Sequence, residues 1–285
     1  MIKAIILDVD GVLKGSKEGV NYPIPHQSVI NALKDIHKKG IPVILCTGNY
    51  YYSIIDIITL ANLRNPHITD RGALVVNPLE NKVIEKHIIE KNLVVRIIEA
   101  LLPLQNYLEV YSDHHYYVWK NQVTEFTKKR AIILRQDPII IDSLIKDTQS
   151  QDILKINAFA MNAEEKQNIT KTIEPFQNTV SMAFTGNPSI GTIEVANITA
   201  KGITKLHAAQ LILNLLKIPF DSVLGAGDSV SDWDFMSKCK YAAAMGNAAN
   251  ELKELVKTKG EGNYFIAPHV DKNGILDVFR YFKIL

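Results

Sequence analysis

Apolar residues follow two periodicities in the first quarter of the chain. Short apolar runs predict buried strands, and the segments between them carry apolar residues at helical spacing. The predicted strands are Ile2–Leu7, Ile41–Cys46, His67–Thr69 and Ala73–Val76. The predicted helices are His26–Lys39 and Tyr51–Asn62. This alternation favours a parallel sheet covered by helices on both faces.

The middle of the chain has a different pattern. Two strand pairs are close enough in sequence to form hairpins: Tyr107–Tyr111 with His115–Trp119, and Thr179–Phe184 with Gly191–Ala196 around residues 186–189. Between and before them lie a further strand and two helices, namely Ile153–Met161, Ala163–Ile173 and Lys91–Leu102. Antiparallel pairs with intervening helices predict a separate α+β module of ordinary domain size.

The alternation of strands and helices predicted for the first quarter of the chain then resumes. Predicted helices and strands alternate again over Lys201–Leu216, Ser222–Ala226, Ser231–Lys238, Tyr241–Met245 and Asn250–Lys257. We therefore predict an α/β fold: a doubly wound parallel-sheet core over residues 1–84 and 195–285, with an α+β cap inserted at 85–194.

Composition narrows the classes of function. The 285 residues are 47% hydrophobic and 22% charged, with a formal net charge of +2, as in ordinary globular proteins. The basic residues do not gather on a face that would bind nucleic acid. No apolar stretch reaches the ~18–20 residues that are needed to cross a bilayer. The two cysteines, Cys46 and Cys239, form neither a zinc spacing nor a disulfide framework. The apolar N-terminal stretch is too short for a signal peptide, so we expect a cytoplasmic protein.

Two carboxylates follow the first strand directly. Asp8 and Asp10 flank one residue, and Gly11 lets the chain turn away without a side chain. In open α/β sheets, ligands bind beyond the carboxyl ends of the strands, so paired acids there are candidates for catalysis. Asp and Gly are also common turn residues, and the motif alone leaves that alternative open.

Three further segments offer complementary groups. Thr47-Gly48 follows the second strand, where a hydroxyl and free N–H groups could bind an anion or merely cap a helix. Lys201 lies where we predict a helix to start, and a cation there opposes the helix dipole. An anionic partner in space would explain this position, and a solvated surface lysine is the alternative. Asp228 and Asp232 follow a glycine-rich strand end. They could be capping groups, but acids gathered beside Asp8 would need a cation, and oxygen-rich sites suit magnesium.

Together these groups are the parts that phosphoryl transfer requires. A carboxylate can be the nucleophile, a second acid can protonate the leaving group, and a lysine with a cation can neutralise the phosphoryl oxygens.

The ordered set of segments resembles the four motifs of the haloacid dehalogenase superfamily. The segments are Asp8-Val-Asp10-Gly-Val, Thr47-Gly48, Lys201-Gly202 and Gly227-Asp228-Ser-Val-Ser-Asp232. Met245-Gly-Asn-Ala248 and Glu251-Leu-Lys253 resemble the type IIB, or Cof-like, phosphatases of that superfamily, whose C2 cap agrees with the predicted insert. The resemblance covers essentially the whole chain.

The resemblance implies a role for each matching residue. Asp8 would be the nucleophile and Asp10 the general acid/base. Mg²⁺ would be held by Asp8, the Asp10 carbonyl, Asp228 and, directly or through water, Asp232. Phosphate or substrate binding would fall to Gly11, Thr47, Gly48, Lys201 and Asn247. The implied reaction is hydrolysis of a small phosphorylated metabolite, such as a sugar phosphate, through an aspartyl-phosphate.

Three positions depart from the family pattern. Asn49 replaces a frequent arginine, Ser231 a common asparagine, and Arg71 a usual asparagine; none is a residue that the chemistry requires. A phosphosugar mutase of the same superfamily and a non-catalytic sensor of a phosphorylated ligand remain the alternatives. Product analysis would distinguish a mutase from a phosphatase. Tight ligand binding without turnover would identify a sensor.

The cap hairpin is rich in aromatic and histidine side chains: Tyr116, Tyr117, Trp119, His114 and His115. Packing against the cap helices is the leading interpretation for each aromatic residue. Lys155 and Asn157, on the following strand, could face the cleft. The sequence identifies neither the physiological substrate nor the oligomeric state.

Overall fold

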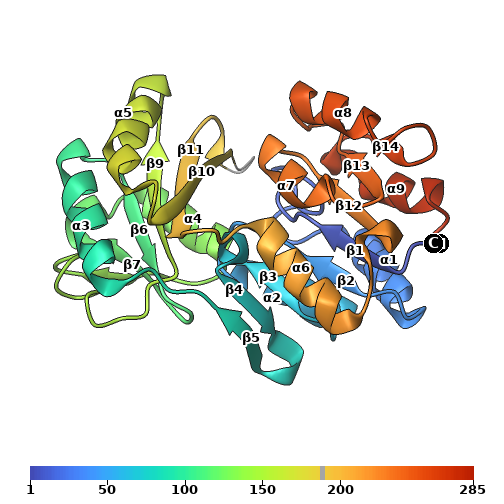
Figure 1. The fold of residues 1–285 in the computed structure, drawn as a ribbon, viewed down its shortest axis with the longest axis horizontal. Helices are drawn as coiled ribbons and strands as arrows, with labels where there is room; N and C mark the ends of the chain where they lie inside the picture. Colours follow the sequence, from blue (N-terminus) through green and yellow to red (C-terminus); the bar gives the residue numbers. More distant parts are fainter. Residues whose placement is uncertain (187–189) are drawn as a thin grey trace.

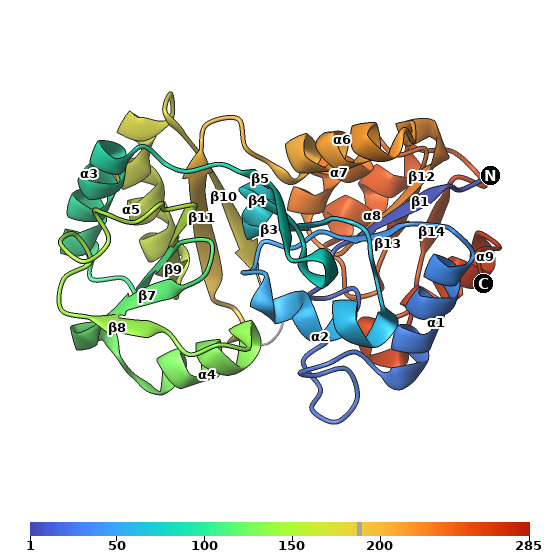
Figure 2. The ribbon, with the colours of Figure 1, turned by 90° about the horizontal axis from the view of Figure 1, so that it is seen from below.

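The computed structural model describes residues 1–186 and 190–285 and has two lobes, with both termini in the same lobe (Figures 1 and 2). Residues 187–189, within the turn predicted around 186–189, lie outside the described residues. The lobe that holds the termini is the predicted core, and the other is the predicted cap.

The core is built on a five-stranded sheet in the order β14-β13-β12-β1-β2, and every pair of neighbouring strands in it is parallel. The strands are β1 (Ala4–Leu7), β2 (Val43–Leu45), β12 (Val223–Gly227), β13 (Tyr241–Ala244) and β14 (Tyr264–Ile266). The chain winds outward from β1 to β2 and later from β12 in the opposite direction. The carboxyl ends of β1 and β12 therefore meet at a topological switch point, where α/β proteins place their sites.

Helices cover both faces of this sheet, as the alternating residues of β1 require (Figure 2). Ile5 and Leu7 face one side, packed with α1 (Gln27–Lys38), α2 (Tyr52–Ala61) and α9 (Ile275–Tyr281). Ala4 and Ile6 face the other, packed with α6 (Lys205–Leu216), α7 (Trp233–Met236) and α8 (Asn250–Lys257). The predicted doubly wound core is confirmed.

A small antiparallel sheet extends the core beside β2. It comprises β3 (His67–Thr69), β4 (Leu74–Asn77) and β5 (Lys82–Lys86), and a bridge between Cys46 and Ile68 connects it to the β2 end. The chain leaves the core for the cap directly after β5 (Figure 1).

The cap is a six-stranded sheet in the order β10-β11-β9-β6-β7-β8. Its strands are β6 (Leu108–Tyr111), β7 (Tyr116–Trp119), β8 (Ile139–Ile141), β9 (Lys155–Ala160), β10 (Val180–Gly186) and β11 (Glu194–Ala200). Both predicted hairpins form antiparallel pairs. Helices α3 (Lys91–Leu101) and α5 (Ala163–Ile173) pack on one face of the sheet. Helix α4 (Glu125–Leu134) packs on the other, where Tyr50 of the core joins the same cluster.

Strand pairing moves the expected domain boundaries. β11 runs to Ala200 and pairs with β9 and β10, so the return to the core comes after residue 200 rather than at 195. The first boundary, at 84, falls within β5, which pairs with β4 of the core. We therefore propose a cap of residues 87–200. The helix predicted from Lys201 begins at Lys205, because residues 201–204 form the connection after β11.

Candidate active site

Asp8 lies in the first position after β1, buried at the centre of the sheet edge. Its backbone N–H donates to the Ala226 carbonyl at 3.0 Å, which continues the pairing of β1 with β12. Three residues on, Gly11 has φ +84°, and a Cβ there would lie 2.0 Å from Asp228 Oδ2. The loop after β1 therefore needs glycine twice over, for its backbone angle and for the close approach of Asp228.

The lysine beside Asp8 is Lys205, so the expectation for Lys201 is corrected. Lys205 Nζ lies 2.6 Å from Asp8 Oδ1 and 2.7 Å from Asp232 Oδ1, and the side chain is buried. Lys201 is exposed and donates to the Gln177 carbonyl of the cap at 2.5 Å.

The physical reason is the position of the helix start. Thr204 is the N-cap of α6, and its hydroxyl accepts from the His207 N–H at 3.2 Å. Lys205 therefore occupies the first helical position, at the sheet edge. Threonine is a typical N-cap residue, so the sequence held this signal three positions after the lysine that we selected.

Three carboxylates converge at this edge: Asp8, Asp228 and Asp232 offer oxygens that all lie within 4.8 Å of one another. Burial raises the pKa of Asp8 to about 7, with the Asp232 charge adding to the rise and Lys205 opposing it. Burial and the Asp8 charge also hold the pKa of Asp228 well above its usual range. The single ammonium of Lys205 does not neutralise the negative charge of three carboxylates, so the site fits a further cation. An all-oxygen donor set suits Mg²⁺.

Asp232 is held more tightly than its neighbours. Its Oδ2 accepts from the Asp228 N–H at 3.2 Å, the Ser229 N–H at 3.0 Å and the Ser229 hydroxyl at 3.1 Å, while Oδ1 is bound to Lys205. Both oxygens are thus engaged by the protein. Ser231, which departs from the family pattern, contacts the Ser229 hydroxyl at 2.7 Å and so supports this loop.

The segment after β2 brings Thr47 and Asn49 to the same edge. The Asn49 N–H donates to Thr47 Oγ1 at 3.0 Å, and Asn49 Nδ2 donates to Asp10 Oδ2 at 2.7 Å. Helix α2 begins only at Tyr52, with Tyr51 as its N-cap, so Thr47 does not cap that helix. Asn49 instead orients the carboxylate of Asp10, a contact that the sequence did not reveal.

Asn247 supports the loop that carries Gly11. Its Nδ2 donates to the Gly11 carbonyl at 2.8 Å and lies 3.5 Å from Asp228 Oδ2, and its Oδ1 accepts from the Val270 N–H at 2.9 Å. Asn247 therefore lies beside the carboxylate cluster, with its amide oxygen already engaged. Its part in phosphate binding stays a prediction.

A cavity opens above these groups, between the two lobes. Its core walls are Asp8, Asp10, Thr47, Gly48, Asn49, Lys205, Asp228, Ser229 and Ser231. Its cap walls are Arg130, Asn157, Thr185, Gly186, Val195 and Asn197. Five of the residues selected from the sequence, together with Lys205, thus share one cavity with polar cap residues.

Arg130 is one of the cap residues of this cavity that the sequence analysis did not select. It lies on α4, which was not predicted, and its Nε and Nη2 each donate to Glu109 at 2.9 Å. Both side chains are buried, and the Tyr111 hydroxyl also donates to Glu109. Nothing in the local sequence links positions 109 and 130, because helix and strand meet only in the folded cap.

Lys155 and Asn157 differ in what they do on β9. Lys155 is fully buried, and its Nζ lies 2.7 Å from both Asp70 Oδ1 and the Gly48 carbonyl. It therefore attaches the cap to the loop after β2. Asn157 lines the cavity, and its Oδ1 is buried with no hydrogen-bond partner among the described residues.

The hairpin aromatics pack rather than line the described cavity. Tyr116 stacks on Tyr111 with ring centroids 5.5 Å apart, and Tyr117 lies in the apolar cluster beneath the cap helices.

Among the described residues, no helix is long and apolar enough to cross a membrane.

Comparisons with known proteins identify the family to which the chain is similar. A sequence profile of the haloacid dehalogenase-like hydrolases matches residues 5–279. The chain is 25% identical to the stress response protein YhaX of Bacillus subtilis, over 87% of this chain and 84% of that protein. It is 24% identical to the phosphoglycolate phosphatase of Staphylothermus marinus, over 97% and 99% of the two chains. The solved structure of a subclass IIB sugar phosphatase superposes with a TM-score of 0.79 at 22% identity, covering 99% and 100%.

Proposed function

Because the chain belongs to the haloacid dehalogenase-like hydrolases, we propose that it is a magnesium-dependent phosphatase acting on a small phosphorylated metabolite. The observation that carries the proposal is the buried contact of Lys205 with both Asp8 and Asp232, beside Asp10 and Thr47 in one cavity. The names of two relatives, a phosphoglycolate phosphatase and a sugar phosphatase, support the same reaction class.

Asp8 is the proposed nucleophile. One of its carboxylate oxygens forms a bond to phosphorus, the ester P–O bond breaks, and the leaving oxygen takes a proton from Asp10. In the second step Asp10 removes a proton from water, the water oxygen bonds to phosphorus, and the acyl phosphate bond breaks. Phosphate leaves and the Asp8 carboxylate is restored. Asn49 assists by holding the Asp10 side chain in place.

Side chains of the core lobe balance the negative charge of the phosphoryl group during its transfer. Lys205 offers an ammonium 2.6 Å from Asp8, and Thr47 a hydroxyl at the cavity wall. Asp8, the Asp10 carbonyl and Asp228 would hold Mg²⁺, with Asp232 fixing Lys205 and the loop. When bound, Mg²⁺ supplies positive charge that stabilises the phosphoryl oxygens and offsets repulsion among the carboxylates.

The cap residues favour a substrate that carries hydroxyl groups. Arg130, Asn157, Thr185 and Asn197 all line the cavity and offer hydrogen-bonding groups. Asn157 Oδ1 is buried without a partner among the described residues, and a substrate hydroxyl could donate to it. We therefore propose a phosphorylated sugar or a similar polyol.

A panel of phosphorylated metabolites, incubated with the full-length protein and Mg²⁺, tests the proposal. We expect release of inorganic phosphate from sugar or polyol phosphates, abolished by EDTA and by Asp8→Asn. An isomerised phosphosugar with little free phosphate would instead identify a mutase. Tight binding of panel members without turnover would identify a sensor, and either result would overturn the phosphatase assignment.

A further inference from the structure

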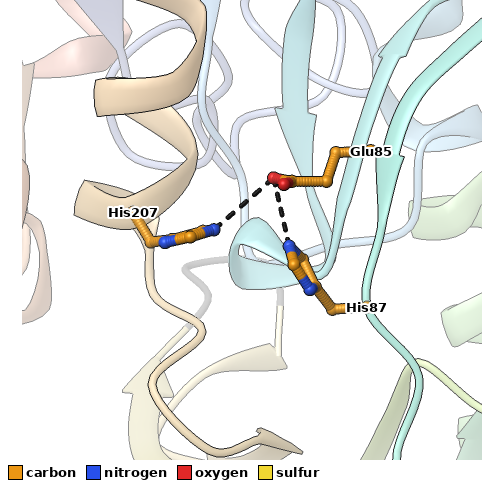
Figure 3. Close-up of side chains that lie close together, drawn as sticks. All are labelled: Glu85, His87 and His207. Carbon is orange, nitrogen blue, oxygen red and sulfur yellow. Dashed lines mark ion pairs between the residues drawn. The ribbon is translucent and has the colours of Figure 1, made fainter.

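A second cluster of ligating side chains lies outside the catalytic cavity. Glu85 on β5, His87 just after β5 and His207 in the first turn of α6 point toward one another (Figure 3). Their candidate ligand atoms all lie within 4.8 Å of one another. The cluster joins segments more than a hundred positions apart in sequence, so it is not a local turn.

Glu85 Oε2 is the common atom of the cluster. It lies 3.0 Å from His87 Nε2 and 3.5 Å from His207 Nε2 (Figure 3). The two imidazole rings meet edge to face, with centroids 5.1 Å apart. Two ligands bound to one Zn²⁺ at about 2.0–2.1 Å in a tetrahedral arrangement are separated by about 3.3 Å. The two separations from Glu85, 3.0 and 3.5 Å, bracket that value.

Two of these atoms lack ordinary partners. Glu85 Oε2 and His87 Nε2 are shielded from solvent and make no hydrogen bond to any described residue. Within the described part of the chain, no lysine or arginine lies within ion-pair distance of Glu85 either. The two atoms lie 3.0 Å apart without hydrogen-bond geometry between them, and buried polar atoms are normally hydrogen-bonded, so a shared ligand would satisfy both. The His207 side chain is 42% exposed, which leaves an access route and room for water ligands.

The geometry points to a binding site for a divalent transition metal, with zinc as its natural occupant, formed by Glu85, His87 and His207. Two imidazoles and one carboxylate are a donor set typical of zinc, and imidazole disfavours Mg²⁺ and Ca²⁺ relative to zinc. The site is therefore chemically distinct from the all-oxygen cluster at Asp8. Its existence does not depend on the proposed phosphatase activity.

The position of the cluster gives such a metal a structural consequence. The chain enters the cap through residues 87–90 and returns through 201–204. His87 is the first residue of one connection, and His207 follows the other by one turn. A bound metal would cross-link the start of the first connection to the first turn of α6, the helix that carries Lys205.

Cobalt and zinc titrations of the full-length protein test the site. After chelator treatment and with saturating Mg²⁺, Co²⁺ is added while its visible ligand-field absorption is recorded, and Zn²⁺ binding is measured by calorimetry. We expect histidine-ligated Co²⁺ in the wild type, and at least a tenfold loss of Zn²⁺ affinity in Glu85→Gln, His87→Gln and His207→Gln. Any zinc taken up by the catalytic carboxylates is common to all these proteins.

His114→Gln is the matched control. It removes an exposed histidine that also lies 4.0 Å from a carboxylate, that of Asp113. We expect it to bind zinc like the wild type. Zinc should also slow hydrogen exchange in residues 86–90 and 202–207 of the wild type but not of His207→Gln, whose metal-free melting temperature should be unchanged. Equal zinc affinity in the wild type and all three ligand variants would overturn the proposal.

Discussion

Substituting Lys205 and Lys201 separately distinguishes the structural assignment from the one suggested by sequence. Lys205→Met removes the ammonium 2.6 Å from Asp8 and 2.7 Å from Asp232 while keeping an unbranched side chain. Lys201→Met removes an exposed ammonium whose hydrogen bond is to the Gln177 carbonyl. The two lysines lie four positions apart, so the pair is closely matched.

The expected effect at Lys205 is large for two reasons. Hydrogen bonds between a charged donor and a buried carboxylate contribute roughly 1.5–3 kcal/mol each. Removing a preorganised group that stabilises transition-state charge typically lowers kcat by about 10²–10³. We therefore expect Lys205→Met to lose at least about two orders of magnitude in kcat, and Lys201→Met to stay within about threefold of the wild type.

Phosphate release from an active panel substrate, measured under saturating Mg²⁺, is the assay. Lys205→Met also leaves the carboxylates unpaired, so circular dichroism and thermal melting with Mg²⁺ must show that it is folded. The assignment would be refuted if folded Lys205→Met retained wild-type kcat, or if Lys201→Met lost as much activity as Lys205→Met.

Three further predictions follow from the same site. In EDTA, Asp8→Asn should be more stable than the wild type above pH 7, by up to about 4 kcal/mol, because a pKa of about 7 penalises ionised Asp8 in the folded state. Urea titrations should show this gap narrowing from pH 7 to 4, whereas a pH-independent gap would contradict it. Gly11→Ala should weaken Mg²⁺ activation because its Cβ would displace Asp228, whereas Gly19→Ala, with φ +72° but open space, should not; equal activation curves would contradict it. Asn157→Ala should raise KM about tenfold with little change in kcat, as expected for one lost substrate hydrogen bond, and steady-state kinetics with an unchanged KM would exclude that contact.

Short-range patterns predicted much of the core and part of the site. Alternation of apolar runs and helical periodicity identified the parallel sheet, because each element buries its own apolar face. Asp8 and Asp228 could be found from sequence because each lies directly after a strand, with Asp10 two residues beyond Asp8, and parallel strand ends meet at one edge. The Lys201 error came from placing a helix start four residues early.

The cap contacts could not be predicted in the same way. Helix α4 has little amphipathic pattern, since its buried Arg130 faces Glu109 and its Ile132 is exposed. The pairing of Arg130 with Glu109, and of Lys155 with Asp70, brings together distant polar residues that look like surface charges in sequence. Only tertiary packing turns them into a buried wall and an attachment between lobes.

The most direct test of the central claim is to detect the phosphoryl group on Asp8. An aryl phosphate with an acidic phenol needs no proton for its leaving group, so Asp10→Asn should form the acyl phosphate and hydrolyse it slowly. We predict that the acid-quenched Asp10→Asn protein carries one added HPO₃ on the peptide containing Asp8, and that Asp8→Asn/Asp10→Asn carries none. Phosphate release by Asp8→Asn at the wild-type rate, or the added mass on another residue, would contradict the account.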